Sequence, residues 1–194
     1  MSEWDDYAAD WDSPDTRLYA DRAFASWQRS VAPFAPDLAQ CRVLDFGCGT
    51  GLLSETFAPL CKGIVAIDTS PQMIAVLEKK IETAGIANIR PLATAIDPAS
   101  IRVHDCLAGG FDIVLASSVW SFLPDYPATL ADLASLLEPG GIFTQWDWES
   151  DMPAKRIADA MDASGLEKIA IETAFGLEGG DETMPVIMGT ARRS

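Results

Sequence analysis

Three closely spaced glycines follow a strand-like run in the segment VLDFGCGTGLL, residues 43–53. Glycine costs backbone entropy, so Gly47, Gly49 and Gly51 together indicate a turn in which side chains would obstruct a ligand. Such a turn can present its backbone N–H groups, and the start of the next helix, to a bound group. Asp45 adds a carboxylate that can reach a cationic or amine group, or can simply pin the turn.

The spacing of these glycines argues against one common class of nucleotide site. A dinucleotide-binding turn has the pattern G-x-G-x-x-G, which requires its third glycine at position 52. That residue is Leu52, so a nicotinamide- or flavin-dependent oxidoreductase loses its main support. Asp68 ends the next strand-like run, and its carboxylate can accept hydrogen bonds from both ribose hydroxyls of an adenosine.

Strand-like and helix-like patterns alternate along most of the chain and must position these residues. We expect strands at residues 42–46, 63–68, 88–93, 111–117 and 142–148. We expect helices at residues 14–32, 51–59, 71–84, 98–107, 127–137 and 153–164. Ser70 is a plausible N-cap for the third helix and Gly85 its stop, while Pro91 pushes the third strand toward an edge of the sheet.

Two further strand-like runs, residues 166–175 and 185–192, are joined by a segment too short for a helical crossover. They should pair as an antiparallel hairpin. The expected fold is an α/β open sheet that is parallel except for one strand, with helices on both faces.

Composition excludes several classes of function. The net charge of −15 repels a polyanion, so DNA and RNA are poor candidate partners. No apolar run reaches the roughly 18 residues of a membrane span, and the acidic N-terminus does not resemble a secretory signal. The cysteines form no C-x-x-C pair, and the lone His104 cannot complete a zinc set, so we expect reduced thiols, a cytoplasmic location and no metal. The cysteines are Cys41, Cys48, Cys61 and Cys106.

The segments VLDFGCGTG, VAIDTS, FDIVLASSVWSFL and LEPGG together resemble class I S-adenosylmethionine-dependent methyltransferases. Among these the chain is most similar to the small-molecule group typified by ubiquinone and menaquinone biosynthesis enzymes, over about residues 41–150. The resemblance implies a Rossmann-like, seven-stranded methyltransferase fold in residues 41–194, with residues 1–40 as a helical cap or lid. It implies S-adenosyl-L-methionine as cofactor, S-adenosyl-L-homocysteine as product, and in-line transfer of a methyl group to a small-molecule acceptor. Residues 1–40 and the 118–127 loop would cover the site.

The resemblance also implies a role for each residue that matches its motifs. Asp45 and the glycine turn would hold the methionine part of the cofactor, Asp68 would hold the ribose, and Ser117 would line the methyl-transfer side. The turn residues are Gly47, Cys48, Gly49, Thr50 and Gly51, and the residues near the adenine are Thr69, Ser70, Met73, Thr94, Ala95 and Ile96.

One position departs from the family pattern. The family usually places an acidic residue just after the third strand, where it contacts the adenine amino group. This chain has Thr94 and Ala95 there, and Asp97 comes slightly late. Either Asp97 takes that part, or Thr94 and a backbone group do.

Aromatic residues stand near the expected ends of two strands and in the N-terminal region. Trp120 follows the fourth strand, and Trp146 and Trp148 end the fifth. Each could face the site, where an aromatic face stabilises a sulfonium by about 0.5–2 kcal/mol, or could pack in the core. Similar enzymes fold an N-terminal segment over the cofactor, which would give Tyr7 or Trp11 a place in the site.

No residue stands out as a general base, which methyl transfer needs only when the acceptor must lose a proton. The candidates His104, Asp147, Glu149 and Tyr7 have equal weight, so the catalytic residue is unknown. This gap keeps open a second hypothesis, a non-catalytic module that binds S-adenosylmethionine or a partner. The oligomeric state has no signal in the sequence.

Two methyltransferase subclasses are disfavoured by the residues after the fourth strand. Amino methylases of DNA carry an Asn/Asp-Pro-Pro-aromatic run there, whereas residues 117–120 read SSVW. Protein arginine methylases place two glutamates in this region, and residues 112–137 contain none. The leading hypothesis, a methyltransferase that acts on a small molecule, rests on the glycine turn, Asp68 and the other motifs that carry the resemblance.

Overall fold

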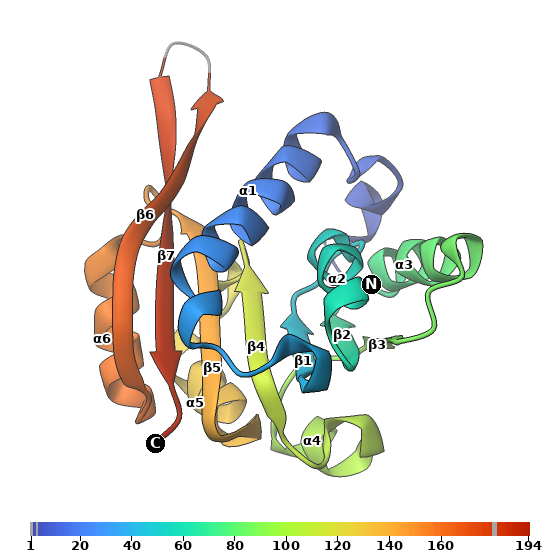
Figure 1. The fold of residues 1–194 in the computed structure, drawn as a ribbon. Coiled ribbons are helices and arrows are strands. Elements are labelled where there is room, and N and C mark those ends of the chain that lie inside the picture. Colours follow the sequence, from blue (N-terminus) through green and yellow to red (C-terminus); the bar gives the residue numbers. More distant parts are fainter. Residues whose placement is uncertain (1, 3, 180–181) are drawn as a thin grey trace.

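The computed structural model describes residues 2, 4–179 and 182–194. Its strands form one seven-stranded sheet in the order β3-β2-β1-β4-β5-β7-β6 (Figure 1). Among the described residues β7 alone runs against the other strands, because it pairs antiparallel with both β5 and β6. The predicted open, mostly parallel sheet is therefore confirmed. The strands are β1 (Arg42–Phe46), β2 (Gly63–Asp68), β3 (Ile89–Ala93), β4 (Phe111–Ser117), β5 (Leu137–Trp148), β6 (Glu167–Gly179) and β7 (Glu182–Arg192).

Helices cover both faces of this sheet. One face packs against α1 (Pro14–Ser30), α2 (Leu52–Phe57) and α3 (Pro71–Ala84). The other face packs against α4 (Pro98–Val103), α5 (Tyr126–Leu136) and α6 (Ala154–Ser164). Short 3-10 helices fill the connections: η1 (Asp5–Asp10), η2 (Ala32–Phe34), η3 (Leu38–Gln40), η4 (Ala58–Leu60), η5 (Asp105–Leu107) and η6 (Trp120–Phe122).

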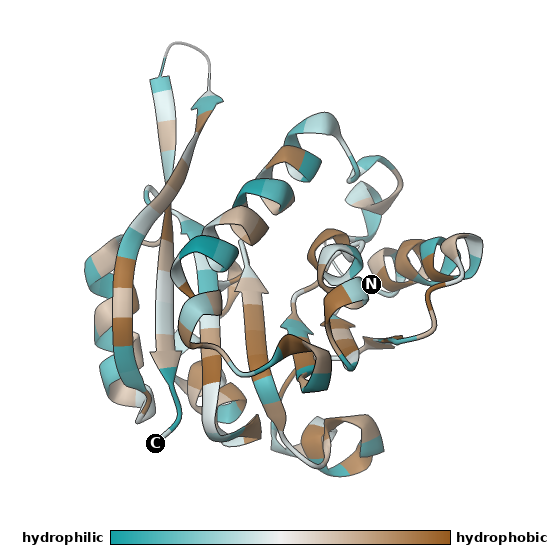
Figure 2. Ribbon diagram, in the orientation of Figure 1, coloured by the Kyte–Doolittle hydropathy of each residue, from teal (hydrophilic) through white to brown (hydrophobic). Residues whose placement is uncertain are grey.

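The two cores follow from alternation along the central strands. In β1 and β4, Val43 and Ile113 face the α1 side, while Leu44 and Val114 face the α5 side, and all four are fully buried. Strands buried on both faces are mainly apolar, and Figure 2 shows tan and brown along most of β4. Helix α1 belongs to this packing, since Trp27 is fully buried in it.

Local signals set the ends of α3 as predicted. The Ser70 hydroxyl accepts the N–H of Met73 at 3.1 Å, and Pro71 begins the helix. Gly85 ends it with a left-handed φ of 66°. Strand β3 lies at the edge of the sheet, as Pro91 predicted. Asp68 is the last residue of β2, where it pairs with Ala93 of β3.

The structure corrects the predicted boundaries of the last three strands. Strand β5 begins at Leu137 rather than residue 142, because Leu137 pairs with Phe111 and the Gly140 N–H bonds to Arg193. Strands β6 and β7 extend past the predicted 166–175 and 185–192, since Leu177 pairs with Met184. The hairpin projects beyond the rest of the sheet (Figure 1), and its residues 180–181 lie outside the described residues.

Every helix within the described ranges is too short or too polar to cross a lipid bilayer.

Candidate functional site

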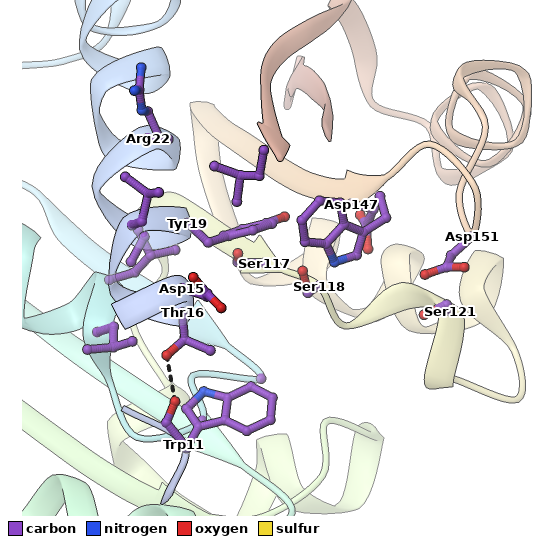
Figure 3. A pocket seen from close by; sticks show the side chains of 18 of the residues that line it. Trp11, Asp15, Thr16, Tyr19, Arg22, Ser117, Ser118, Ser121, Asp147 and Asp151 are labelled. Carbon is purple, nitrogen blue, oxygen red and sulfur yellow. Dashed lines mark hydrogen bonds between the residues drawn. The ribbon is translucent and has the colours of Figure 1, made fainter. Parts of the chain in front are cut away.

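A cavity of about 700 Å³ lies where β1, β4 and β5 end. The strand order reverses between β1 and β4, and open α/β sheets bind ligands at such a point. Five parts of the chain form its walls: the N-terminal segment with α1, the glycine turn, the loop after β4, the end of β5 and the β6–β7 hairpin. Figure 3 shows the cavity from close by, with Tyr19, Ser117, Ser118 and Asp147 around its middle.

The glycine turn has positive φ angles at all three glycines. A Cβ on Gly47 would lie 2.3 Å from Val119 Cγ2, and one on Gly51 would lie 2.4 Å from Leu77 Cδ1. Packing within the protein therefore explains these two glycines. Gly49 differs, because a Cβ there would meet the Trp11 indole at an ordinary 3.4 Å. Trp11 and Gly49 both line the cavity.

Asp45 places a buried carboxyl at one end of the cavity. It ends β1 beside the turn, is 1% exposed, and accepts a 2.6 Å hydrogen bond from the Ser54 hydroxyl at Oδ2. The pKa of Asp45 is raised to about 6, mainly by burial and also by the negative charge of the nearby Asp68. A carboxylate in this position suits a cationic amino group, because pairing with a cation offsets the cost of its burial.

Asp68, the last residue of β2, connects that strand to the glycine turn after β1. Its Oδ2 accepts the Gly49 N–H at 2.9 Å and its Oδ1 accepts the Ser70 N–H at 2.8 Å. Burial raises the pKa of this carboxyl, while those N–H groups lower it. A carboxylate oxygen can accept a second hydrogen bond, so both oxygens keep capacity for ribose hydroxyls.

The structure gathers some of the expected site residues around the cavity and leaves the others beside it. Those that line it are Asp45, Gly47, Cys48, Gly49 and Ser117. Those outside its lining are Thr50, Gly51, Asp68, Thr69, Ser70, Met73, Thr94, Ala95 and Ile96. The residues outside it lie in the glycine turn, at the end of β2, at the start of α3 and after β3.

The N-terminal segment contacts two of these residues. Ser70 donates a 2.6 Å hydrogen bond to Asp5, and Thr50 donates a 2.5 Å hydrogen bond to Asp12. Lys80 of α3 binds Asp12 at 3.0 Å and also pairs with Glu55. These contacts tie the first residues of the chain to the glycine turn and to α3.

The tryptophans divide between core and cavity. Trp120 and Trp146 are fully buried in the core, where the Trp146 Nε1–H donates to Ser26 Oγ at 2.9 Å. Trp148 and Trp11 line the cavity, and Tyr7 does not. Trp146 and Trp120 therefore belong to the core and do not line the cavity.

Of the four base candidates, Asp147 lines the cavity, whereas His104, Glu149 and Tyr7 do not. His104 ends α4, and Asp97 caps the start of the same helix by accepting the N–H groups of Ala99 and Ser100, both at 2.7 Å.

Sequence reasoning missed part of the lining. Leu177, Glu178 and Met184 come from the hairpin, whose extension into this region had no pattern of its own. Asp15 and Arg22 come from α1, where their spacing around Tyr19 (i−4 and i+3) places all three on one helix face. That spacing was a usable signal.

No group of three or more potential metal-ligating side chains lies among the residues that the structure describes.

Comparison with known proteins identifies the family. A family model described as a methyltransferase domain matches residues 44–143. The chain belongs to this family. Its family and fold are those of class I S-adenosylmethionine-dependent methyltransferases, and S-adenosylmethionine is the cofactor of that class.

Among curated proteins, the chain is 37% identical over 108 residues to a ubiquinone biosynthesis O-methyltransferase of Xanthomonas euvesicatoria pv. vesicatoria (strain 85-10). The match covers 54% of this chain and 42% of that protein, so the chain spans less than half the length of this relative.

Two solved structures share the fold over nearly the whole chain. A SAM-dependent methyltransferase from Aquifex aeolicus has a TM-score of 0.73 at 17% identity and covers 98% of each chain. N-methyltransferase NodS from Bradyrhizobium japonicum WM9, in complex with S-adenosyl-L-homocysteine, has a TM-score of 0.67 at 19% identity, over 94% of this chain and 89% of that one.

The residues present fit the cofactor of this class. The buried Asp45 carboxyl faces the cavity and can pair with an amino group, and the turn beside it leaves Gly49 without a side chain. Asp68, held by two backbone N–H groups, can accept hydroxyl donors.

Proposed function

We propose that this chain transfers a methyl group from S-adenosylmethionine to a small-molecule acceptor. The main support is one continuous cavity that is lined by Asp45 and the glycine turn as well as by Tyr19, Ser117 and Asp147. Its volume, about 700 Å³, lies within the roughly 300–1,000 Å³ typical of small-molecule sites. Such a cavity can hold the reacting part of a cofactor together with a compact acceptor.

The proposal assigns the cofactor residues as follows. Asp45 and the turn from Gly47 to Gly51 hold the methionine part, and Asp68 holds the ribose. Because Asp97 Oδ1 already accepts two helix N–H groups, we favour Thr94 and the backbone of Ala95 and Ile96 for the adenine amino group. Thr69 and Met73 complete the adenine side, and Ser117 faces the methyl group.

The bound cofactor supplies a methyl group activated by a sulfonium. The protein then contributes binding, orientation and exclusion of water, which together lower the barrier of a displacement reaction. Residues 1–40 act in this proposal as the helical cap over residues 41–194. The contacts of Asp5 with Ser70 and of Asp12 with Thr50 support a covering role for that segment.

The proposed acceptor is a small molecule rather than a nucleic acid, because the chain carries a net charge of −15. The four cysteines are all free thiols in the structure, which supports the further proposal of a reducing, cytoplasmic environment.

Two measurements test the proposed function. Calorimetry with S-adenosyl-L-homocysteine should show binding, and absence of binding at millimolar ligand would contradict the proposal. Transfer of a labelled methyl group to any member of an acceptor library, lost in Asp68→Ala, would exclude a non-catalytic binding module. Cofactor binding without transfer to any acceptor would favour that module instead.

A further inference from the structure

Carboxyl groups outnumber basic side chains in the lining of the cavity. Asp15, Asp147, Asp151 and Glu178 line it, beyond the Asp45 that the proposed function assigns to the cofactor. Arg22 is the one basic side chain among the described residues in its lining. A low-dielectric cleft lined by one sign of charge attracts ligands of the opposite sign and repels those of the same sign. The cavity therefore favours a cationic ligand over a carboxylate or a phenolate.

Tyr19 gives a second and independent indication of a ligand. Its side chain is 8% exposed, and its hydroxyl has no hydrogen-bond partner among the described residues. The ring points into the cavity, and the hydroxyl lies toward Ser117 and Ser118, which line the same cavity (Figure 3). Buried hydroxyl groups in proteins nearly always have a partner, so this one is positioned to accept a hydrogen bond from a ligand.

Two aromatic rings lie together in the lining of the cavity. Tyr19 packs edge-on against Trp148, with ring centroids 5.2 Å apart, and both rings line the cavity. Ammonium groups are stabilised over aromatic faces by about 0.5–2 kcal/mol, and more strongly where water is excluded. Carboxylates and aromatic rings together form the recognition chemistry for a protonated amine.

Asp147 is held in place for such a ligand. It is 1% exposed, and its Oδ2 accepts a 2.9 Å hydrogen bond from Gln145 Nε2. The Tyr126 hydroxyl donates to Gln145 Oε1 at 2.6 Å, which turns the amide so that its N–H group faces Asp147. Backbone N–H groups of Trp120 and Val119 also interact with this carboxyl and lower its pKa. Asp147 lines the cavity, where a carboxylate oxygen can accept a further hydrogen bond from a ligand.

We infer that the acceptor is an amine that enters as an ammonium ion, with its N–H groups on Asp147 and the Tyr19 hydroxyl, and that Asp147 accepts its proton. This inference rests on the proposed methyl transfer and names the acceptor class for that same cavity. It makes Asp147 the catalytic base and Tyr19 a binding residue.

The chemistry balances in atoms and charge. The ammonium gives one proton to the Asp147 carboxylate, which becomes neutral, and the nitrogen regains its lone pair. The nitrogen–carbon bond forms as the sulfur–carbon bond breaks, the sulfur keeps the electron pair, and the product is a methylated ammonium. Burial raises the pKa of Asp147 to about 8, closer to the usual pKa of an alkyl ammonium, about 10.4 for lysine, and this eases the proton transfer. The bound ammonium itself favours the ionised carboxylate from which the transfer starts.

The test begins with binding, which does not depend on turnover. A series of amines from benzylamine to tryptamine, each beside the alcohol and the carboxylate of the same skeleton, is titrated calorimetrically into the complex with S-adenosyl-L-homocysteine. We expect at least one amine to bind about tenfold or more tighter than its two counterparts, a difference of about 1.4 kcal/mol. Mass spectrometry after incubation with S-adenosylmethionine should then place the new methyl group on nitrogen.

Three variants make the test specific. Asp147→Asn keeps the shape and should weaken amine binding about tenfold or more, with unchanged affinity for S-adenosyl-L-homocysteine. Tyr19→Phe removes only a hydroxyl and keeps the buried ring, so the variant should fold normally and weaken amine binding about threefold. Asp21→Asn removes an exposed carboxylate of α1 outside the cavity and should change neither affinity.

The outcomes separate the two proposals. Alcohols or carboxylates that bind as tightly as the amines, or methylation on oxygen, would overturn the inference and leave the proposed function standing. The same holds if S-adenosyl-L-homocysteine binds but no amine does, or if Tyr19→Phe and Asp147→Asn bind amines like the parent protein. Failure to bind S-adenosyl-L-homocysteine at all would remove the proposed function itself.

Discussion

The backbone N–H of Gly49 donates a 2.9 Å hydrogen bond to Oδ2 of Asp68. The glycine turn after β1 and the carboxylate that ends β2 are thus parts of one structure. Asp68→Ala removes the acceptor for this N–H group and for that of Ser70, together with the acceptor proposed for ribose. We expect the Kd for S-adenosyl-L-homocysteine to rise roughly thirtyfold, about 2 kcal/mol, in calorimetry.

Glu82→Ala is the matched control, since it removes an exposed carboxylate from α3. It should leave the Kd unchanged. An Asp68→Ala variant that is folded and still binds with the parent affinity would show that Asp68 only supports the turn.

Gly47→Ala should lower the free energy of unfolding by about 2–4 kcal/mol, because it adds both backbone strain at φ +67° and an overlap 2.3 Å from Val119. Gly140→Ala separates these causes: its φ is +80°, but its Cβ would meet no atom within 4 Å. Urea denaturation should show a smaller loss for Gly140→Ala, about 1–2 kcal/mol. Equal losses in the two variants would argue against the overlap with Val119.

Ser26→Ala should destabilise the protein by about 1–3 kcal/mol, because it leaves the Trp146 indole N–H buried without an acceptor. Thermal and urea unfolding would measure the loss. Ser135→Ala, an exposed serine on α5, is the control and should change stability by less than about 0.5 kcal/mol. A loss in Ser26→Ala no larger than in this control would mean that the indole finds another partner.

Folding stability should fall as pH rises toward 8. Burial raises the pKa of Asp147 to about 8 and that of Asp45 to about 6, above the ordinary value near 3.9. The folded protein thus holds protons that the unfolded chain has released. The stabilisation is complete below about pH 4 and is lost as pH rises through the two folded-state values.

Asp147→Asn isolates one of these groups. Between about pH 6.5 and 8.5, urea unfolding of this variant should show a shallower decline than the parent protein, while Asp21→Asn should follow the parent. A parent protein whose stability is flat or rising over this interval would contradict the raised pKa of Asp147.

Lys80→Met should loosen the N-terminal segment, because Lys80 pairs with Asp12 and Glu55 and donates to the Thr50 carbonyl. Hydrogen exchange should quicken in residues 4–12 relative to the parent protein. Lys79→Met, at an exposed neighbouring position with no ion pair among the described residues, should leave that exchange unchanged. Equal exchange in both variants would assign the attachment to Asp5 and Ser70 instead.

Much of the fold could be predicted because its signals are local. Strands β1 and β2 contain short apolar runs, and helix α3 begins after a capping serine and ends at a glycine. Each element formed where those residues indicated. The single antiparallel strand followed from a connection too short for a crossover. Asp45 and Asp68 could be placed at strand ends for the same reason.

The rest depends on contacts between distant residues. Pro139 and Gly140 look like a helix stop, and pairing of Leu137 with Phe111 draws them into β5. The hairpin grew because backbone pairing at Leu177 and Met184 needs no apolar pattern. The hydrophobic pattern of the sequence could not predict that Glu178 and Asp147 line the same cavity. It also could not predict that Trp146 is buried while Trp148 is partly exposed.

The first dozen residues have one more consequence. Asp5 and Asp12 hold residues 4–12 against Ser70 and Thr50, and Trp11 lies beside Gly49 of the turn. In the proposed function, S-adenosylmethionine would lie beneath these contacts. Release of the product would then require the contacts to break, and the rate of that opening would set an upper limit on turnover.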